Sequence, residues 1–243
     1  MAQDLDLSIR IRTKDETQGF RSTRDGIKAV NDRIDNARRA LIAFFSIGAA
    51  VAGTREIIRV ADAWQQVNAR LRLAVASTQE YVRAQTALFQ IAQATRSEFG
   101  STADLYARLA RSTKDLGASQ ATLLAVTETV NKAIQLSGVS AEAANAALIQ
   151  LSQGLAAGAL RGDELRSVLE QTPRLAEAIA QGLGVTIGEL RALGEQGKLT
   201  AEAIINSLLK AGENVNQEFS QMPATVGQAL TQVGNAWARF IGQ

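Results

Sequence analysis

The sequence predicts a mostly α-helical protein with one N-terminal β-strand, then a long heptad-patterned helix or helical hairpin, then a compact globule of many short helices. Three observations predict this fold class. Aromatic residues are only 5% of the chain, while alanine, leucine, glutamine and arginine, which favour helices, are abundant. Apolar residues recur at helical spacing over long stretches. From residue 77 onward, capping residues and glycines alternate, which predicts short helices.

Residues 1–16 form the predicted strand segment. Leu5, Leu7, Ile9 and Ile11 alternate with polar residues, which is the period of a half-buried strand. Because a single strand cannot satisfy its own backbone groups, we expect it to pair with the same segment of another copy or with the edge of a partner sheet. A frayed terminus with accidental alternation is the alternative.

Residues 17–76 carry a heptad pattern. Its apolar positions are Ile27, Val30, Ile34, Ala37, Leu41, Phe44, Gly48 and Val51, followed by Ile57, Val60, Trp64, Val67, Leu71 and Ala74. The phase changes near Arg55 and Glu56, which indicates a stutter between two helical stretches. The pattern leaves two interpretations open, a hairpin that folds onto the rest of the domain and an intermolecular coiled coil.

The uncharged run from Ala40 to Thr54 lies within this region. Its 15 residues are fewer than the ~20 that a membrane-spanning helix needs. Its length therefore favours a buried helix segment over a membrane-active one, and contact with a membrane stays the open alternative.

Residues 77–212 are predicted to form the compact multi-helix domain. Helix starts are expected at Ser77 with Glu80, Ser101 with Asp104, Ser119, Ser140, Thr172 before Pro173, Thr186 with Glu189, and Thr200. Helix ends are expected at Gly117, Gly138, Gly184, Gly194 and Gly212, since glycine tolerates the left-handed conformation that follows a helix.

Residues 213–243 are predicted to be a linker and an amphipathic helix that starts at Pro223. Its apolar stripe comprises Val226, Leu230, Val233, Trp237 and Phe240 or Ile241. The stripe has three interpretations: packing into the core, a binding face, and the opening of a longer helix that continues in relatives.

The glycines between Gly154 and Gly162 need a separate explanation. We expect Gly158 to allow close helix packing and Gly162 to form a turn before Asp163, because an interior glycine destabilises a helix by about 1 kcal/mol. Neither glycine-rich phosphate-binding motif is present.

The composition restricts the possible functions. The chain has 26 basic and 24 acidic residues and neither cysteine nor histidine. Disulfides, thiolate metal sites and catalysis by a histidine base are therefore excluded. Asp163, Glu164 and Glu170 could in principle act as catalytic carboxylates, but acids in a first helical turn ordinarily complement the helix dipole. We expect no enzymatic activity, no metal and no cofactor.

A DNA-binding regulator is the alternative function. The segment from Ile179 to Thr186 is similar to the turn of repressor-type helix-turn-helix domains, within a predicted motif at residues 175–193. However, the second helix would offer only Arg191 to base edges and also carries Glu189. We therefore expect no specific nucleic-acid binding.

One stretch is far more distinctive than the rest of the chain. It runs from Gln150 to Glu202 and reads QLSQGLAAGALRGDELRSVLEQTPRLAEAIAQGLGVTIGELRALGEQGKLTAE. This stretch resembles the N-terminal region of the tail tape measure proteins of long-tailed bacteriophages and prophages, and a looser similarity extends from about Arg55 to Gly242. The residues that match the family motif are Gly154, Gly158, Arg161, Gly162, Glu164, Leu165, Arg166, Pro173, Gly184, Glu189, Gly197 and Leu199.

The resemblance implies a structural role in tail assembly. A protein of this family would lie in the lumen of the tail tube in the virion, and in the host cytoplasm during assembly, and it would help to set tail length and to nucleate the tube. The implied partners are the tail tube protein, tail assembly chaperones, tail tip or baseplate proteins and further copies of the same chain. The motif residues are then expected to serve the fold and its contacts rather than chemistry.

Overall fold

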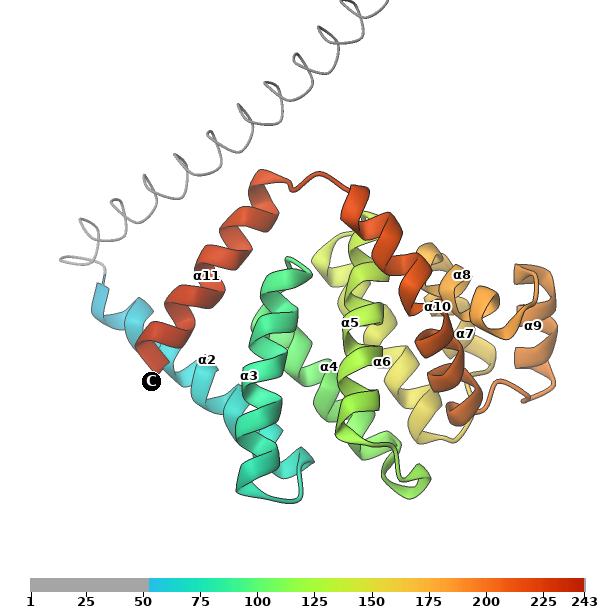
Figure 1. Cartoon of the computed structure of the whole chain (residues 1–243), viewed down its shortest axis with the longest axis horizontal. Helices are drawn as coiled ribbons and strands as arrows, with labels where there is room; N and C mark the ends of the chain where they lie inside the picture. Colours follow the sequence, from blue (N-terminus) through green and yellow to red (C-terminus); the bar gives the residue numbers. More distant parts are fainter. Residues whose placement is uncertain (1–52, 243) are drawn as a thin grey trace, which may run out of the picture. The chain divides into compact units, whose positions relative to one another are not determined.

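A computed structural model describes residues 53–242, which form ten α-helices, α2 to α11, and one short 3-10 helix, η1 (Figure 1). Their bounds are α2 Gly53–Ala74, α3 Thr78–Ala94, α4 Phe99–Ser112, η1 Lys114–Leu116, α5 Gln120–Ser137, α6 Ala141–Ala156, α7 Gly162–Gln171, α8 Pro173–Leu183, α9 Ile187–Glu195, α10 Ala201–Gln221 and α11 Val226–Gly242. The helical class is thus confirmed for these residues. The predicted strand and the first part of the heptad pattern lie outside the described residues.

The heptad seam of α2 is filled by other helices of the same chain. Trp64 is buried and stacks on Phe99 of α4, with 4.7 Å between the ring centroids. Asn68 accepts a hydrogen bond of 2.7 Å from Gln85 of α3. For this helix the structure therefore supports a fold-back onto the domain rather than an intermolecular coiled coil. Arg55 and Glu56, where the heptad phase changes, lie in the first turn of this helix, and the preceding stretch is outside the described residues.

Most of the predicted helix starts are confirmed by side-chain caps. The side-chain oxygens of Ser119, Ser140 and Thr200 each accept a hydrogen bond from the backbone N–H three residues later. Thr186 and Glu189 form a complete capping box. Glu80, in contrast, accepts its backbone hydrogen bond from Ala76 rather than from Ser77. Each cap supplies a partner for an N–H group that the helix itself leaves unpaired.

Two predicted starts are wrong. Ser101 lies inside α4, which already begins at Phe99, and its hydroxyl donates to the Glu98 carboxylate. Pro223 precedes α11, because Thr225 accepts the hydrogen bond from the Gln228 N–H that caps this helix.

Two predicted helix ends are wrong for a different reason. Gly194 and Gly212 both lie inside helices, α9 and α10. A β-carbon at Gly212 would lie 3.2 Å from Thr129 Oγ1 of α5, and one at Gly194 would overlap the Leu165 side chain. These glycines permit close helix contacts instead of ending a helix. Gly117, Gly138 and Gly184 do adopt the left-handed conformation at helix ends, as predicted.

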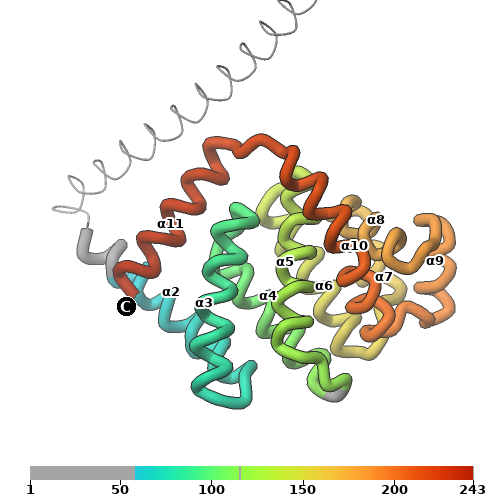
Figure 2. The backbone as a smooth tube through the Cα atoms, viewed as in Figure 1, coloured from blue at the N-terminus to red at the C-terminus, as the bar shows by residue number. Residues whose placement is uncertain are grey.

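Helix α10 is the central packing element of the second half of the described chain. It packs along both α5 and α8, while α6 packs on α7 and α4 (Figure 2). The fully buried side chains of these helices include Tyr106, Leu109, Leu151, Leu155, Leu175 and Ile179. The core is therefore shared by helices far apart in the sequence.

Helix α11 lies beside α3 (Figure 2). Asn235 is buried, accepts a hydrogen bond from the Phe99 N–H and donates to the Ser97 carbonyl. Val226, Leu230 and Phe240 of the apolar stripe are exposed. Packing of the whole stripe into the core, the first of its three interpretations, is thus wrong. No helix in the described range 53–242 is long and apolar enough to cross a membrane.

Candidate functional site

The structure brings the two halves of the distinctive stretch together at one junction. Between α6 and α7 the chain runs antiparallel to the loop that precedes α10, with a single bridge that pairs Ala159 with Thr200. Leu160 N donates to the Leu199 carbonyl at 2.8 Å, and Ala201 N donates to the Gly158 carbonyl at 3.0 Å. We call residues 158–162 and 197–201 the bridge junction. It satisfies backbone groups that would otherwise be left unpaired beside the core.

An apolar centre lies beneath the bridge junction. Leu160 and Leu199 are completely buried. A β-carbon at Gly154 of α6 would lie 2.6 Å from Leu160 Cδ1 and 3.0 Å from its Cα, which is too close for a real side chain. Gly154 therefore lets α6 approach the bridge junction directly, and Leu165 of α7 packs in the same way against Gly194 of α9.

The close-packing role predicted for Gly158 is wrong. Gly158 follows the end of α6 with φ +87°, and no atom outside its immediate neighbourhood lies within 4 Å of a β-carbon placed there. The position requires glycine for its backbone conformation, and the packing role belongs to Gly154. Gly162 was predicted to form a turn before Asp163; in the structure it is the first residue of α7 and has φ +53°, a conformation that favours glycine.

A groove opens beside the bridge junction, between α7 and α9. Its volume is about 460 Å³, and its lining comprises Gly162, Asp163, Leu165, Arg166, Leu169, Glu170, Arg191 and Glu195. Arg166 donates to the Asp163 carboxylate at 2.6 Å, although both side chains are largely exposed. The groove thus combines a leucine floor with a rim of both charges, and such a surface suits contact with another protein better than a small apolar ligand.

The groove residues do not form a recognisable catalytic or metal centre. Asp163 and Glu164 lie in the first turn of α7, where acids complement the helix dipole. Among the described residues no group of three or more acidic side chains is placed to hold a metal ion. Arg161 caps the start of α7 through its backbone only, and its Nη1 lies 3.8 Å from a β-carbon placed at Gly197.

The remaining motif residues lie at helix ends rather than at the bridge junction. Pro173 is at the first turn of α8, as predicted, and Gly184 ends the same helix with φ +72°. The Glu189 carboxylate accepts hydrogen bonds from the backbone and the hydroxyl of Thr186, and these bonds hold the pKa of Glu189 below its ordinary value. These positions therefore define where helices begin and end.

Helices α8 and α9 do flank a tight turn, as the helix-turn-helix interpretation requires. However, the exposed charged side chains of α9 are Glu189, Arg191 and Glu195. A helix that reads DNA needs donors directed toward bases and phosphates. The turn therefore provides no electrostatic argument for nucleic-acid binding.

Sequence reasoning missed two structural features next to the motif. Gly182 lies inside α8, and a β-carbon there would overlap the backbone carbonyl of Ser207 in α10. The sequence signal for this contact was the glycine itself, because a glycine inside a helix is destabilising and is usually explained by close packing. Arg174 is buried and donates two hydrogen bonds, of 2.7 and 2.9 Å, to Glu218 of α10. No local pattern indicates this pair, because the partners are 44 residues apart.

Glu218→Gln is expected to lower stability at neutral pH and to matter less in acid. The hydrogen bonds from Arg174 lower the pKa of Glu218 in the folded protein, against a smaller opposing effect of burial. Because the pKa of Glu218 is lower in the folded protein, the charged carboxylate stabilises the fold at pH values above the unfolded-state pKa of ~4.3. This contribution is lost as the pH falls through the lower pKa of the folded state. The effect should be modest, since the Glu218 side chain is half exposed.

Urea unfolding of the wild type and of Glu218→Gln at neutral and acidic pH checks this prediction. The wild-type midpoint should exceed the variant midpoint at about pH 7, and the gap should close toward about pH 3. A gap of constant size would show that the carboxylate charge of Glu218 contributes nothing. Glu213→Gln, an exposed residue of the same helix, is the matched control.

Comparison with known protein families assigns nearly all of the described residues to one family. The family model described as "Tape measure protein" matches residues 55–243, which is most of the chain. No curated protein and no solved structure is significantly similar to this chain. The match includes every motif residue and all helices from α3 to α11. The chain therefore belongs to the tape measure protein family, whose members are structural proteins of bacteriophage tails.

Proposed function

We propose that the compact unit from Arg55 to Gln243 is the part of a tape measure protein that makes assembly contacts, while length is measured by extended helix elsewhere. The family match over residues 55–243 is the observation that carries this proposal. In this proposal the unit acts in the lumen of the tail tube and helps to nucleate the tube. Its partners are the tail tube protein, assembly chaperones and proteins of the tail tip or baseplate.

The helix lengths support contact rather than measurement. The longest described helix is α2, with 22 residues, which corresponds to about 33 Å at 1.5 Å per residue. A straight helix through all 189 matched residues would extend about 280 Å. Because the helices fold back on one another instead, this unit would add little to the length of a tail.

The groove between α7 and α9 is the contact surface that we propose for a protein partner. Its charged rim carries acids and bases in similar number, so pairing with a partner would depend on position rather than on net charge. The chain as a whole has a net charge of only +2, which agrees with recognition by shape. Catalysis has no part in this proposal.

Electron microscopy of tails tests the proposal directly. The gene in its phage or prophage is compared with an in-frame deletion of codons 55–243, which removes the compact unit whole and leaves no partial core. Loss of tails is the expected result. Tails shortened by about 280 Å would instead assign a measuring role to these residues. Tails of normal length and number would contradict any assembly role for this unit.

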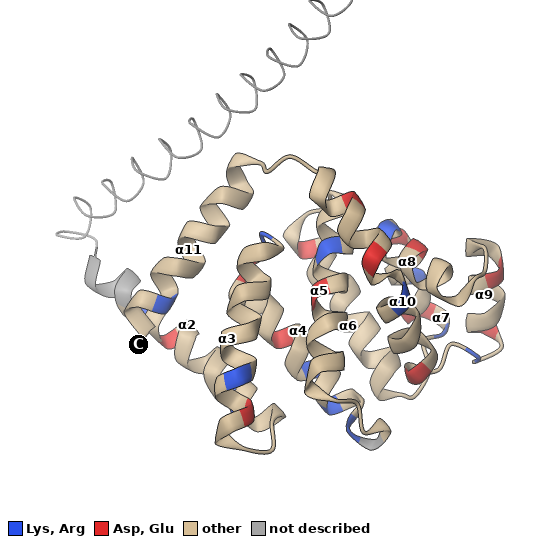
Figure 3. Cartoon of the chain, in the orientation of Figure 1, with Lys and Arg blue, Asp and Glu red and all other residues tan. Residues whose placement is uncertain are grey.

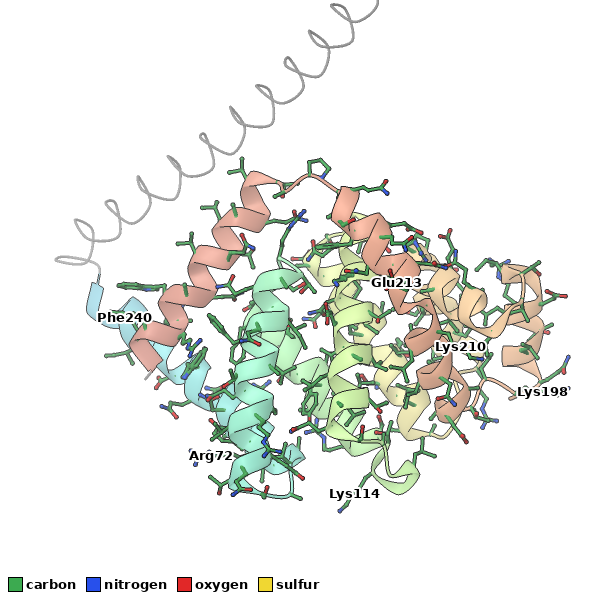
Figure 4. The ribbon with its side chains drawn as sticks, viewed as in Figure 1. Arg72, Lys114, Lys198, Lys210, Glu213 and Phe240 are labelled. Atoms are coloured by element: carbon green, nitrogen blue, oxygen red, sulfur yellow. The ribbon has the colours of Figure 1, made fainter. Side chains whose placement is uncertain are left out.

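A matched pair of point variants keeps the test independent of folding. Arg191→Glu and Glu195→Arg alter the exposed rim of the groove and no buried contact. The combined variant should fold normally and reduce the number of tails. The equivalent double change Lys210→Glu with Glu213→Arg, on the exposed face of α10 (Figure 4), is the control and should leave tails unchanged.

A further inference from the structure

Helix α11 is attached to the rest of the domain mainly by polar residues. The residues that make these contacts step by four and three positions along the helix, and they are Gln228, Gln232, Asn235, Arg239 and Gly242. Within α11, all of which the structure describes, Ala229 is the only buried apolar residue. Helix α10, in contrast, buries Ile204, Leu208 and Phe219 among others. Undocking of α11 would therefore expose little of its own apolar surface.

Amide groups form the centre of this attachment. Gln232 and Gln93 of α3 exchange hydrogen bonds through their side-chain amides and backbone carbonyls, at 2.8 and 3.1 Å. Asn235 accepts a hydrogen bond of 2.9 Å from the Phe99 N–H and donates one of 2.8 Å to the Ser97 carbonyl. Water can replace each of these bonds when the helix leaves, so their net contribution to docking is small.

The linker between α10 and α11 is held by a residue in a strained conformation. Among the residues that the structure describes, Arg96 is the only one other than glycine with a positive φ, of +57°. It lies between α3 and α4, and its guanidinium donates to the Met222 carbonyl at 3.0 Å and to the Gln228 side chain at 3.3 Å. A left-handed conformation costs free energy outside glycine. The attachment of the linker is therefore weakened by backbone strain.

The last turns of α11 cover an aromatic cluster, which comprises Trp64, Phe89 and Phe99. The Trp64 and Phe99 rings stack with centroids 4.7 Å apart, and the centroids of Phe89 and Phe99 are 6.1 Å apart. Arg239, the only charged residue of α11 (Figure 3), lies over the Phe89 ring at 4.5 Å. A β-carbon at Gly242 would overlap the Trp64 ring, so the helix backbone lies directly on it.

We propose that α11 is a latch that opens and closes over the aromatic cluster. In the open form α11 swings away about residues 222–225, while α2 to α10 keep their packing. The main hydrophobic core supports this, because its buried residues come from α2 to α10 and none comes from α11. Elements with few buried apolar contacts open at a lower free energy than the whole domain unfolds. The proposal goes beyond the assembly role and does not depend on it.

Hydrogen exchange of the full chain, followed by mass spectrometry, tests the latch. The amides of α11 should exchange through an opening that leaves α10 protected. Asn235→Ala leaves the Phe99 N–H without a partner in the closed form only, so it should accelerate exchange of α11 by roughly tenfold. Gln232→Ala should act in the same direction with a smaller effect. Asn206→Ala, at an exposed asparagine of α10, is the matched control and should leave exchange of α11 unchanged.

Thiol labelling measures the opening independently, because the chain contains no cysteine. Ala229→Cys places a buried thiol on α11, and Ala211→Cys places one on α10. The thiol on α11 should react with a soluble thiol reagent at least roughly tenfold faster than the thiol on α10. Addition of Asn235→Ala should accelerate the first reaction and leave the second unchanged. Equal helix content by circular dichroism would show that the variants fold.

The outcomes separate this proposal from the proposed function. Exchange of α11 and α10 at one common rate, set by global unfolding, would overturn the latch. Equal labelling rates of the two thiols, or an equal response to Asn235→Ala and Asn206→Ala, would overturn it as well. If Asn235→Ala does not fold, Gln232→Ala carries the same comparison. None of these assays scores tails, so failure here leaves the assembly role standing.

Discussion

Leu160→Ala is expected to destabilise the domain by about 3 to 4 kcal/mol. Leu160 is completely buried and packs directly on Gly154, while its N–H is bonded to Leu199 across the bridge junction. Because this backbone hydrogen bond holds the residue in place, the surroundings cannot collapse into the space that the side chain leaves. A loss well above the lower end of the range for buried leucines, about 2 to 5 kcal/mol, is therefore expected.

Chemical denaturation measures this effect. Leu73→Ala makes the same change at an exposed position of α2 and should alter the free energy of unfolding by less than about 0.5 kcal/mol. Similar losses for the two variants would show that the bridge junction does not belong to the cooperative core. The family motif around Leu160 would then have to be explained by contacts with partners alone.

Gly182→Ala is expected to destabilise the fold by about 3 kcal/mol, which is unusual for the addition of one methyl group. The new β-carbon would overlap the Ser207 carbonyl, so α8 and α10 must move apart. A backbone carbonyl cannot turn away as a flexible side chain can. The displacement would also disturb the Arg174–Glu218 pair, which joins the same two helices.

Gly188→Ala is the control for Gly182→Ala. A β-carbon at Gly188 of α9 meets only Thr186 Oγ1, at an ordinary 3.9 Å, and alanine favours helix over glycine by up to about 1 kcal/mol. Thermal unfolding should therefore show a small gain or no change for Gly188→Ala and a large loss for Gly182→Ala. Losses of equal size would contradict close helix contact as the reason for Gly182.

The sequence by itself determined the features of this protein that depend on a few neighbouring residues. The caps at Ser119, Ser140, Thr186 and Thr200 were predictable, because a hydroxyl and an N–H three residues later meet in any helix start. The left-handed glycines at Gly138 and Gly184 follow from the same local geometry. The buried seam of α2 was visible because helical periodicity marks the side of a helix that must leave water.

Only the tertiary structure decided which partner each helix side meets. Gly154, and not Gly158, allows close packing because Leu160 is folded back onto α6 by the pairing with Leu199. Gly212 continues a helix because α5 lies against it. The stripe of α11 is exposed because its polar residues find buried partners on α3 and α4. In each case, the group that decides the outcome is distant in sequence. It is selected because its shape is complementary and because it satisfies buried hydrogen bonds. Local preference carries no information about such partners.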